Sequence, residues 1–251
     1  MKLSIIIPVY NEEKTVSTVL EKVFRVKLPC RKEIIVVDDG SIDGTGNRIK
    51  NYACPPSAIA EGNCRRELRI KNLKIITHKK NQGKGAAVRT GIKAATGDYI
   101  LIQDADLEYN PDEIPKLLSP VINQVSGIRE QGSVGTAVYG SRFQSNSAVI
   151  PRLYLWGNKL LTFLTNLLYG TKLTDMETGY KLLPSSFLKK VHLVGNRFEI
   201  EPEITIKLIK AKIPIVEVPI SYRSRSHLSG KKLTVRDAWG AVKTLLFNKF
   251  N

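Results

Sequence analysis

Several features common in proteins are scarce in this chain of 251 residues. It has three cysteines, Cys30, Cys54 and Cys64, and their spacing matches no zinc-binding pattern. We expect no signal peptide, because charged residues interrupt the opening "MKLSIIIPVYNEE" at once. With an odd number of cysteines and no secretion signal, we expect a reduced, cytoplasmic setting.

Long apolar runs are also lacking. None reaches the ~18 residues that a membrane-spanning helix requires. The closest, 153–170, is interrupted by Asn158, Lys159 and Asn166. Any contact with a membrane is therefore expected to be peripheral, on its cytoplasmic face.

Acidic residues are few relative to basic ones. The chain has 39 Lys and Arg against 23 Asp and Glu, a formal net charge of +16. Such an excess favours anionic partners, such as nucleic acids, anionic membranes or phosphorylated ligands. Aromatic residues make up only 7% of the chain, and in no segment do they alternate with basic residues. The sequence also contains no nucleic-acid-binding motif. We therefore expect no nucleic-acid partner.

The chain does contain a regular alternation of strand-like and helix-like segments. Short apolar runs predict strands at 3–10, 33–40, 73–78, 99–106, 136–143 and 215–223. Helical spacing of apolar residues predicts helices at 13–26, 83–97, 152–170, 198–212 and 235–250. This alternation indicates an α/β fold, with a parallel sheet covered by helices on both faces. Pro and Gly residues within 51–71 predict a surface excursion.

Three of the predicted strands are followed by clusters of polar residues. The first strand leads into "PVYNEE", the second into "VVDDGSIDGT" and the fourth into "DADLEYNP". In open α/β sheets, ligands bind beyond the carboxyl ends of the strands. The coincidence of three polar strand ends therefore predicts a ligand site at this edge of the sheet.

The most informative cluster is the acid pair Asp104 and Asp106. Two residues apart on a strand, these carboxylates would share a face and repel each other unless a cation lies between them. Oxygen ligands suit Mg²⁺ or Mn²⁺, which take one or two carboxylates together with substrate phosphates, and Glu108 is a candidate third ligand. The alternative is a solvated turn whose acids cap the next helix, although Asp112 and Glu113 can serve that helix start.

Two further motifs are ambiguous on their own. "DDGSIDGT" is a good turn sequence in which Asp43 could cap a helix, but its acids could also hydrogen-bond a ribose or a base. "NQGKGAAVRTG" combines glycines that permit close backbone approach with the positive charge of Lys84. It is not a Walker A loop, because Gly85 follows Lys84 in place of Ser or Thr.

Six segments, in order, resemble motifs of the inverting family-two glycosyltransferases of GT-A fold. They are "IIIPVYNEE", "IIVVDDGSIDGT", "NQGKGAAVRTG", "GDYILIQDADLEYNP", "YGSRF" and "TDMETGYKLL". Within that family the chain is most similar to the polyprenyl-phosphate (dolichyl-phosphate) mannose and glucose synthases. The resemblance implies a GT-A, Rossmann-like domain at 1–233 with a mixed, mostly parallel sheet, followed by a C-terminal amphipathic helix at 234–251.

The resemblance also implies a binding site for the nucleotide of a nucleotide-sugar donor. Residues of the first motif would line the base and the ribose, namely Pro8, Tyr10 and Glu12. The acid pair after the second strand, Asp38 and Asp39, would contact the base or the ribose.

A second group of residues is implied to act on the donor diphosphate. Asp104 and Asp106 would hold Mg²⁺ or Mn²⁺ against it, and Lys84 and Arg142 would contact its phosphates. Many relatives have Gln at the position of Glu108, so an acid there adds negative charge beside the diphosphate. The metal and Arg142 would stabilise the charge that grows on the leaving phosphate.

The acceptor implied by the resemblance is a polyprenyl phosphate. Its phosphate monoester is largely dianionic at neutral pH, so it requires positioning more than deprotonation. Asp175 in "DMETGYK" matches a family segment beside the acceptor, either as a base or as an orienting group. Candidate phosphate contacts are Arg152, Lys181, Arg223 and Arg225, each of which could equally be a solvated surface charge.

The polyprenyl chain requires an apolar surface. The helix predicted at 152–170 is apolar on more than one side. The helix predicted at 235–250 has apolar residues on one side and basic residues elsewhere, which is an interfacial pattern. Both are therefore candidates for membrane contact, with packing against the core as the alternative.

The resemblance thus implies a metal-dependent inverting hexosyltransferase. It would move a hexose from GDP-mannose or UDP-glucose to a polyprenyl or dolichyl phosphate, giving a β-linked product. Two alternatives stay open: a transferase of the same fold with a soluble glycan acceptor, and a catalytically silent protein that binds nucleotide sugars or membranes. Intact Asp104 and Asp106 argue against the silent protein. The sequence does not decide the donor, the polyprenol length, a protein partner or the oligomeric state.

Overall fold

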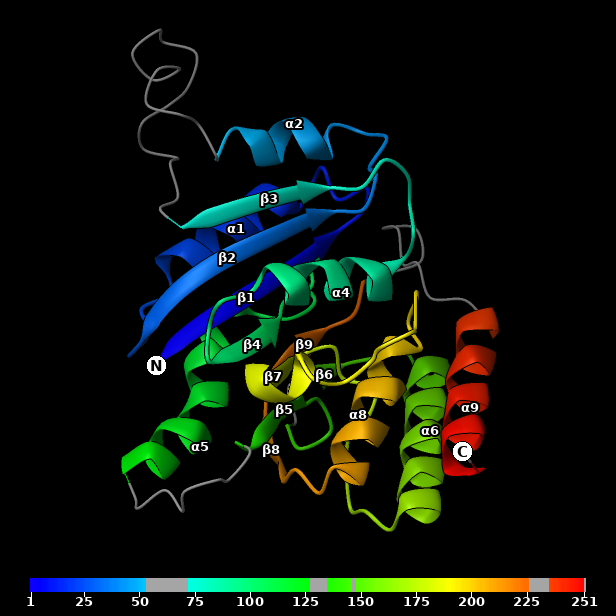
Figure 1. Ribbon diagram of the computed structural model, residues 1–251. Helices are drawn as coiled ribbons and strands as arrows, with labels where there is room; N and C mark the ends of the chain where they lie inside the picture. Colours follow the sequence, from blue (N-terminus) through cyan, green and yellow to red (C-terminus); the bar gives the residue numbers. More distant parts are fainter. Residues whose placement is uncertain (53–71, 127–134, 146–147, 226–234, 251) are drawn as a thin grey trace, which may run out of the picture.

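The computed structural model describes residues 1–52, 72–126, 135–145, 148–225 and 235–250 of the chain (Figure 1). Most of the surface excursion predicted for 51–71 lies outside the described residues. A seven-stranded sheet forms the centre of the molecule, in the order β3-β2-β1-β4-β7-β5-β8, and β6 and β9 pair separately.

The sheet strands alternate with helices along the chain. The strands are β1 (Lys2–Val9), β2 (Arg31–Asp38), β3 (Leu73–Thr77), β4 (Tyr99–Ile102), β5 (Ala137–Ser141), β6 (Ala148–Val149), β7 (Lys181–Pro184), β8 (Ile215–Pro219) and β9 (Tyr222–Arg223). The helices are α1 (Val16–Arg25), α2 (Thr45–Lys50), α4 (Lys84–Ala94), η2 (Pro111–Glu113), α5 (Ile114–Ser126), α6 (Arg152–Tyr169), α7 (Ser185–Leu188), α8 (Ile200–Lys210) and α9 (Val235–Phe250).

The sheet is mixed and mostly parallel, as predicted. Strand β1 runs parallel to both β2 and β4, β2 runs parallel to β3, and β8 runs parallel to β5. The exception is β7, which lies between β4 and β5 and is antiparallel to both. This strand has only four residues, all of them buried, and it was not among the predicted strands.

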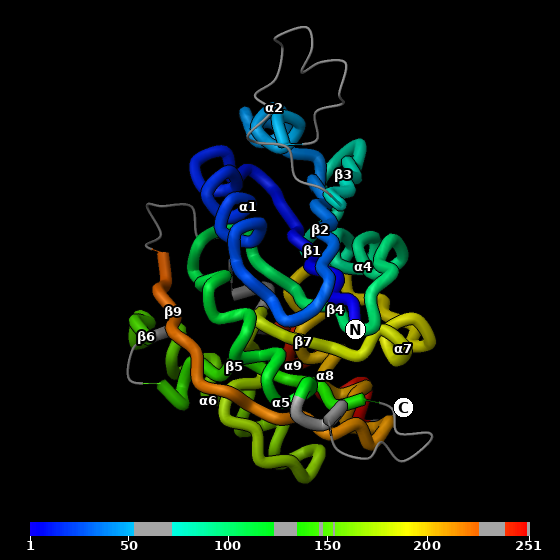
Figure 2. The backbone as a smooth tube through the Cα atoms, turned by 90° about the vertical axis from the view of Figure 1, so that its left-hand side faces the viewer, coloured from blue at the N-terminus to red at the C-terminus, as the bar shows by residue number. Residues whose placement is uncertain are grey.

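Helices cover both faces of the sheet, and the strands alternate between two cores. Ile5 and Ile7 of β1 pack with α1 and α5, whereas Ile6 packs on the opposite face with α4 and α8. Figure 2 shows α1 and α4 on opposite sides of β1 and β2. Successive side chains of a strand point to opposite faces, so this alternation explains why the strand sequences read as continuous apolar runs.

A third core joins the C-terminal helices. Buried Leu161 of α6 packs with buried Ile206 of α8 and with Ala241 and Leu245 of α9, and α6, α8 and α9 lie side by side in Figure 1. The hydroxyl of Tyr169 donates a hydrogen bond of 2.7 Å to the backbone oxygen of Leu245. Helix α9 is therefore attached to the rest of the fold through packed side chains. Within the described ranges, no helix combines the length and apolar character needed to cross a membrane.

Every predicted strand ends earlier than expected, four of them by one or two residues and the other two by four. Strand β4 stops at Ile102, so Asp104 and Asp106 lie in the connection beyond it and strand alternation does not place them together. The segment predicted as one strand at 215–223 is divided into β8 and β9. The helix start predicted in "NPDEI" is η2, where the Asn110 side chain accepts a hydrogen bond from the backbone N–H of Asp112.

Candidate active site

A cavity of about 580 Å³ opens beyond the carboxyl ends of β1, β2 and β4. These three neighbouring strands are parallel, so their ends meet at one edge of the sheet. Seven acidic side chains line the cavity: Glu12, Asp39, Asp104, Asp106, Glu108, Glu177 and Glu201. Four basic side chains also line it: Lys84, Arg142, Arg197 and Arg225.

The turn after β2 is held by its own acid pair. Both oxygens of Asp39 accept hydrogen bonds from the backbone N–H of Gln82, at 3.0 and 3.1 Å, and Oδ2 accepts one from Gly83 at 2.7 Å. Nδ1 of His78 lies 2.6 Å from Oδ1 of Asp39. Asp39 lines the cavity, whereas buried Asp38 accepts a hydrogen bond of 3.0 Å from the N–H of Ser41 and supports the turn from outside the cavity.

Gly83 allows the loop before α4 to approach a second loop closely. Its φ of +98° is in the region that favours glycine, and a Cβ there would lie 2.3 Å from the backbone oxygen of Asn196. The loop that ends at Gly83 is thereby packed against the segment that leads into α8. This contact brings Lys84, at the start of α4, beside Glu201 of α8.

Lys84 forms ion pairs with the loop that follows β4 and with α8. Its Nζ lies 2.8 Å from Oδ1 of Asp104 and 3.1 Å from Oε1 of Glu201. Burial favours the neutral amine, but these two carboxylates outweigh it and raise the pKa of Lys84. The other oxygen of Glu201 lies 2.6 Å from Nζ of Lys181, which is fully buried.

Asp106 faces Arg225 across the cavity. Nη2 of Arg225 lies 3.2 Å from Oδ2 of Asp106, and the guanidinium also makes two hydrogen bonds with Glu12, at 2.9 and 3.1 Å. The pKa of Asp106 is raised to about 7 by burial, then by the charges of Asp104 and Glu108, while Arg225 opposes the rise. Arg225 therefore neutralises part of the negative charge that Glu12, Asp106 and the neighbouring carboxylates bring into the cavity.

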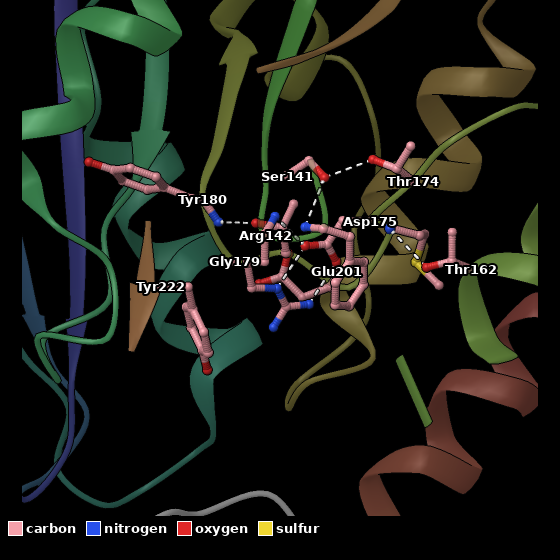
Figure 3. Close-up of polar contacts among 12 residues, drawn as sticks. Ser141, Arg142, Thr162, Thr174, Asp175, Gly179, Tyr180, Glu201 and Tyr222 are labelled. Atoms are coloured by element: carbon pink, nitrogen blue, oxygen red, sulfur yellow. Dashed lines mark hydrogen bonds and ion pairs between the residues drawn. The ribbon is translucent and has the colours of Figure 1, made fainter. Parts of the chain in front are cut away.

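Arg142 and Asp175 form a buried ion pair (Figure 3). Nε and Nη2 of Arg142 each lie 2.7 Å from an oxygen of Asp175, which also accepts the Arg142 backbone N–H at 2.9 Å. The Arg142 guanidinium lies over the ring of Tyr222, at 5.1 Å from its centroid. Asp175 is fully buried and does not line the cavity. It orients Arg142, which does line the cavity.

The fold and this arrangement of charges can be compared with known proteins. The model of the family described as "Glycosyl transferase family 2" matches residues 4–191. The chain belongs to glycosyl transferase family 2. The match spans the three strand-end motifs, the loop before α4 and the segment from Arg142 to Lys181.

Relatives in this family include two named transferases. The UDP-N-acetylglucosamine–dolichyl-phosphate N-acetylglucosaminyltransferase of Methanococcus voltae is 32% identical over 221 residues, covering 86% of this chain and 83% of the relative. The dolichyl-phosphate beta-glucosyltransferase of Saccharomyces cerevisiae is 28% identical over 251 residues, covering 93% of this chain and 69% of the relative.

Solved structures with the same fold include glucosyl-3-phosphoglycerate synthase from Mycobacterium tuberculosis. Its complex with Mg²⁺ and UDP superposes with a TM-score of 0.69 at 19% identity, covering 99% of this chain and 79% of that one. Its complex with Mn²⁺, UDP and glucosyl-3-phosphoglycerate has a TM-score of 0.66 at 18% identity, covering 99% and 80%. The GT-A fold expected from the sequence is therefore confirmed.

Most residues predicted for the donor of this glycosyltransferase line one cavity. Pro8, Tyr10 and Glu12 come from the end of β1 and the loop after it, and Asp39 from the turn after β2. Asp38 is the exception, because it faces the turn. Lys84, Asp104, Asp106, Glu108 and Arg142 also line the cavity.

The four residues predicted to bind the acceptor phosphate are not brought together. Arg225 lines the cavity, but its guanidinium is paired with Glu12 and Asp106. Arg152 and Arg223 are exposed and do not line the cavity. Lys181 is fully buried, pairs with Glu201 and donates to backbone oxygens of Met176 and Thr178, so this arrangement gives it no access to a phosphate in the cavity.

The cavity residues fit a divalent cation, although not with the three ligands predicted. The chain turns at Leu107, which has a φ of +63°, and Glu108 is directed to the Tyr222 hydroxyl and to the Arg225 backbone N–H, at 2.7 Å for the latter. Accordingly, nowhere in the described part of the chain do three His, Cys, Asp or Glu side chains cluster closely enough to hold a metal. Asp104 and Asp106 remain as two carboxylates in a cavity with an acidic excess, which suits a cation that completes its shell with substrate phosphates.

Sequence reasoning missed several cavity residues. Glu177, Asn158, Arg197, Phe198 and Glu201 line the cavity but were not predicted. Glu177 lies inside the "TDMETGYKLL" motif, so its position could have been noted. The other four lie on α6 and around the start of α8, and their sequence context resembles that of any amphipathic helix.

Proposed function

We propose that this glycosyltransferase moves a hexose from a nucleotide sugar to a polyprenyl phosphate. Family membership supports sugar transfer from an activated donor. The names of the two relatives described above each specify a dolichyl-phosphate acceptor. The observation that carries the proposal is one cavity that joins the nucleotide-type residues at the ends of β1 and β2 to Asp104, Asp106 and Arg142.

The donor nucleotide would occupy the side of the cavity formed by β1 and β2. Pro8 and Tyr10 would line the base and the ribose, with Glu12 and Asp39 as hydrogen-bond acceptors. Asp38 would act indirectly, because it holds the turn that carries Asp39.

The diphosphate of the donor would lie toward Asp104, Asp106 and Lys84. We propose that Asp104 and Asp106 hold Mg²⁺ or Mn²⁺, whose charge would stabilise the departing diphosphate. Mycobacterial glucosyl-3-phosphoglycerate synthase has been solved with each of these ions and UDP. A divalent cation would also offset the acidic excess of the cavity, which otherwise disfavours an anionic ligand.

Arg142 would add a positive charge at the leaving diphosphate. Asp175 binds its Nε and Nη2, so the guanidinium is already oriented before the donor arrives. Asp175 itself is buried behind Arg142, which supports an orienting role in preference to that of a base. A dianionic phosphate acceptor requires no base. We therefore propose direct displacement with inversion, giving a β-linked product from an α-linked donor.

The acceptor phosphate would enter beside the basic side chains of the cavity. Arg225 and Arg197 both line it, and Arg225 could exchange its carboxylate partners for phosphate once a cation neutralises Asp106. Arg152 and Arg223 are exposed and lie outside the cavity, where they would attract an anionic surface.

The polyprenyl chain would approach along the exposed faces of α6 and α9. Trp156, Leu160, Phe163 and Leu167 follow helical spacing on α6, and Trp156 is 72% and Phe163 61% exposed. On α9, exposed apolar side chains are Trp239, Leu246 and Phe247. Exposed basic residues accompany them, including Arg152, Lys159 and Lys243. We propose that these faces bind a membrane peripherally, on its cytoplasmic side, which supplies the lipid acceptor.

The decisive experiment incubates the purified chain with polyprenyl phosphate and a panel of radiolabelled UDP- and GDP-hexoses in the presence of Mg²⁺ or Mn²⁺. We expect label from one donor to extract into organic solvent, and NMR of the product to show a β linkage. Label that stays in the aqueous phase on a glycan would favour a soluble acceptor. Donor binding without transfer to any acceptor would favour the catalytically silent alternative.

A further inference from the structure

Glu177 lines the cavity, and one oxygen of its carboxylate lacks a hydrogen-bond donor in the part of the chain that the structure describes. Its Oε1 atom is buried and has no hydrogen-bond partner among the described residues. The charges of two buried ion pairs, Arg142–Asp175 and Lys181–Glu201, act on this residue, and the proposed mechanism does not use it. A buried acceptor without a partner is costly, so its retention at a ligand cavity points to a partner on the ligand.

The backbone on both sides of Glu177 is held in place. The N–H of Met176 donates to the Thr162 hydroxyl at 3.1 Å, and the Thr178 hydroxyl donates to the backbone oxygen of Gly140 at 2.7 Å. The N–H of Gly179 donates to the Tyr109 hydroxyl at 2.9 Å. These bonds attach the segment to α6, β5 and the connection after β4. The fold therefore fixes the backbone position of Glu177.

The same segment touches the part of the cavity assigned to the diphosphate. A Cβ on Gly179 would lie 2.7 Å from Oδ2 of Asp104 and 3.0 Å from Nζ of Lys84. Glu177 is thus two residues from Gly179, where the segment meets the residues proposed to bind the diphosphate. The residues assigned to the base and the ribose, such as Pro8 and Asp39, come from β1 and β2 instead.

The charge state of Glu177 depends on its neighbours. Burial raises its pKa to about 7, Glu201 and Asp175 contribute to the rise, and Lys181 and Arg142 oppose it. An acceptor in this setting is best satisfied by a neutral O–H donor, which brings no further charge into the site. The donor diphosphate is ionised and carries no such group. A hexose carries several hydroxyl groups next to the diphosphate.

We infer that Glu177 accepts a hydrogen bond from a hydroxyl group of the transferred hexose, and thereby selects and orients the sugar. The inference rests on the proposed function, because it requires a nucleotide sugar in the cavity. It distinguishes Glu177 from Arg142 and Lys84, which would bind the diphosphate whether or not a sugar is attached.

The test compares a nucleotide sugar with its parent nucleoside diphosphate. Calorimetry with Mg²⁺ first identifies which UDP- or GDP-hexose the unaltered chain binds. The Kd of that nucleotide sugar and the Kd of the corresponding UDP or GDP are then measured for Glu177→Ala and Glu177→Gln. Asp112→Asn, an exposed carboxylate outside the cavity, serves as the control.

We expect Glu177→Ala to weaken nucleotide-sugar binding by about 10- to 100-fold, as for the loss of a hydrogen bond to a charged group. Binding of the nucleoside diphosphate should change less than about twofold, since the diphosphate contacts remain. Glu177→Gln keeps an acceptor oxygen and should lose less affinity for the sugar. Its melting temperature should equal or exceed that of the unaltered chain, because it removes a buried charge.

Donors that lack single hydroxyl groups locate the contact. The analogue without the hydroxyl that Glu177 binds should show a reduced affinity that Glu177→Ala does not lower further. Equal weakening of the sugar nucleotide and the nucleoside diphosphate, together with a lower melting temperature of Glu177→Gln, would assign Glu177 a structural role and overturn the inference. So would unchanged binding of both. If the unaltered chain binds no nucleotide sugar, the proposed function fails and the inference fails with it.

Discussion

The two sides of the cavity hold their carboxylates in different ways. On the side of β1, β2 and β4, backbone N–H groups contribute: Asp39 accepts bonds from Gln82 and Gly83, and Asp106 accepts one of 3.1 Å from Glu108. Asp104 and Asp106 are also paired with Lys84 and Arg225, two cations that themselves line the cavity. On the side of β5, β7 and α8, cationic side chains dominate. Asp175 binds Arg142, and Glu201 binds Lys181 and Lys84.

This difference indicates which carboxylates serve ligand binding and which also stabilise the fold. A carboxylate held by neutral N–H groups, or by a cation that lines the cavity, can take a ligand or a metal ion as a new partner. A carboxylate paired with a buried cation instead compensates that cation, and its removal leaves an uncompensated charge in the interior. Removal of Asp106 should therefore impair binding and turnover, whereas removal of Asp175 or Glu201, each paired with a buried cation, should also destabilise the fold. The predictions below test this contrast.

The largest expected effect is that of Asp106→Asn on turnover. The substitution removes a proposed metal-binding charge, and we expect activity to fall about 10²- to 10³-fold or more, as when a group that stabilises transition-state charge is removed. Arg225 keeps its two bonds to Glu12, so the melting temperature should stay close to that of the unaltered chain. Addition of EDTA should abolish activity. Full activity in EDTA would refute the metal role, and Asp112→Asn controls for loss of a carboxylate.

Asp175→Asn should have the largest effect on stability. It leaves the Arg142 charge buried without its counterion, which typically costs about 3–5 kcal/mol of the free energy of unfolding. Urea denaturation measures this loss. The double variant Arg142→Met, Asp175→Leu replaces both charges by apolar groups and should unfold at a higher urea concentration than Asp175→Asn alone. Equal stability of Asp175→Asn and the unaltered chain would remove the contrast between the two sides.

Glu33 offers a test outside the cavity, because it combines both kinds of support. Burial alone would raise its pKa, but hydrogen bonds from Ser4, Lys2 and Thr96 outweigh burial and lower the pKa to about 2. Because the folded pKa lies below the unfolded value, the stabilisation is present above about pH 4.5 and is lost as the pH falls toward 2.

Glu33→Gln should therefore lower the free energy of unfolding at pH 7 by about 3 kcal/mol, from the size of the pKa shift. The difference from the unaltered chain should narrow as the pH is lowered from 5 toward 3. Denaturation at a series of pH values measures it. A difference that does not depend on pH would indicate that the charge of Glu33 contributes nothing.

The smallest effect on stability is expected for substitutions on the exposed face of α6, the helix that packs against α8 on the second side of the cavity. The double variant Trp156→Gln, Phe163→Gln should change the free energy of unfolding by less than about 0.5 kcal/mol, because both side chains are exposed. Sedimentation with anionic liposomes should fall by roughly 10-fold or more, given the apolar area these side chains can insert.

Ile42→Gln provides the matched control, because Ile42 is 86% exposed but lies in the turn after β2, on the nucleotide side. It should leave liposome binding unchanged. High salt should weaken binding of every variant, because it screens the attraction between basic side chains and anionic lipid. Equal loss with Ile42→Gln and with the α6 variant would show that the membrane face is not confined to the second side.

The sequence by itself determined the main strands and the position of the cavity. Apolar runs at the strands that became β1, β2, β3 and β4 define a parallel sheet, and parallel strands bring their carboxyl ends to one edge. Polar residues that follow those ends, such as Tyr10, Asp39 and Asp104, must therefore meet. This follows from chain direction and local pattern alone, and so these residues could be predicted to share a site.

Only the tertiary structure decided which charges pair and which helix faces are covered. Lys181 was predicted to bind a phosphate, but β7 places it in the interior, where Glu201 of α8 compensates it. Helix α6 is apolar on several sides, and only its packing with α8 and α9 shows that Leu161 is buried while Trp156 is exposed. The physical reason is the same in both cases: the free energy of a buried charge or an apolar face depends on the groups that contact it, and these come from distant parts of the chain.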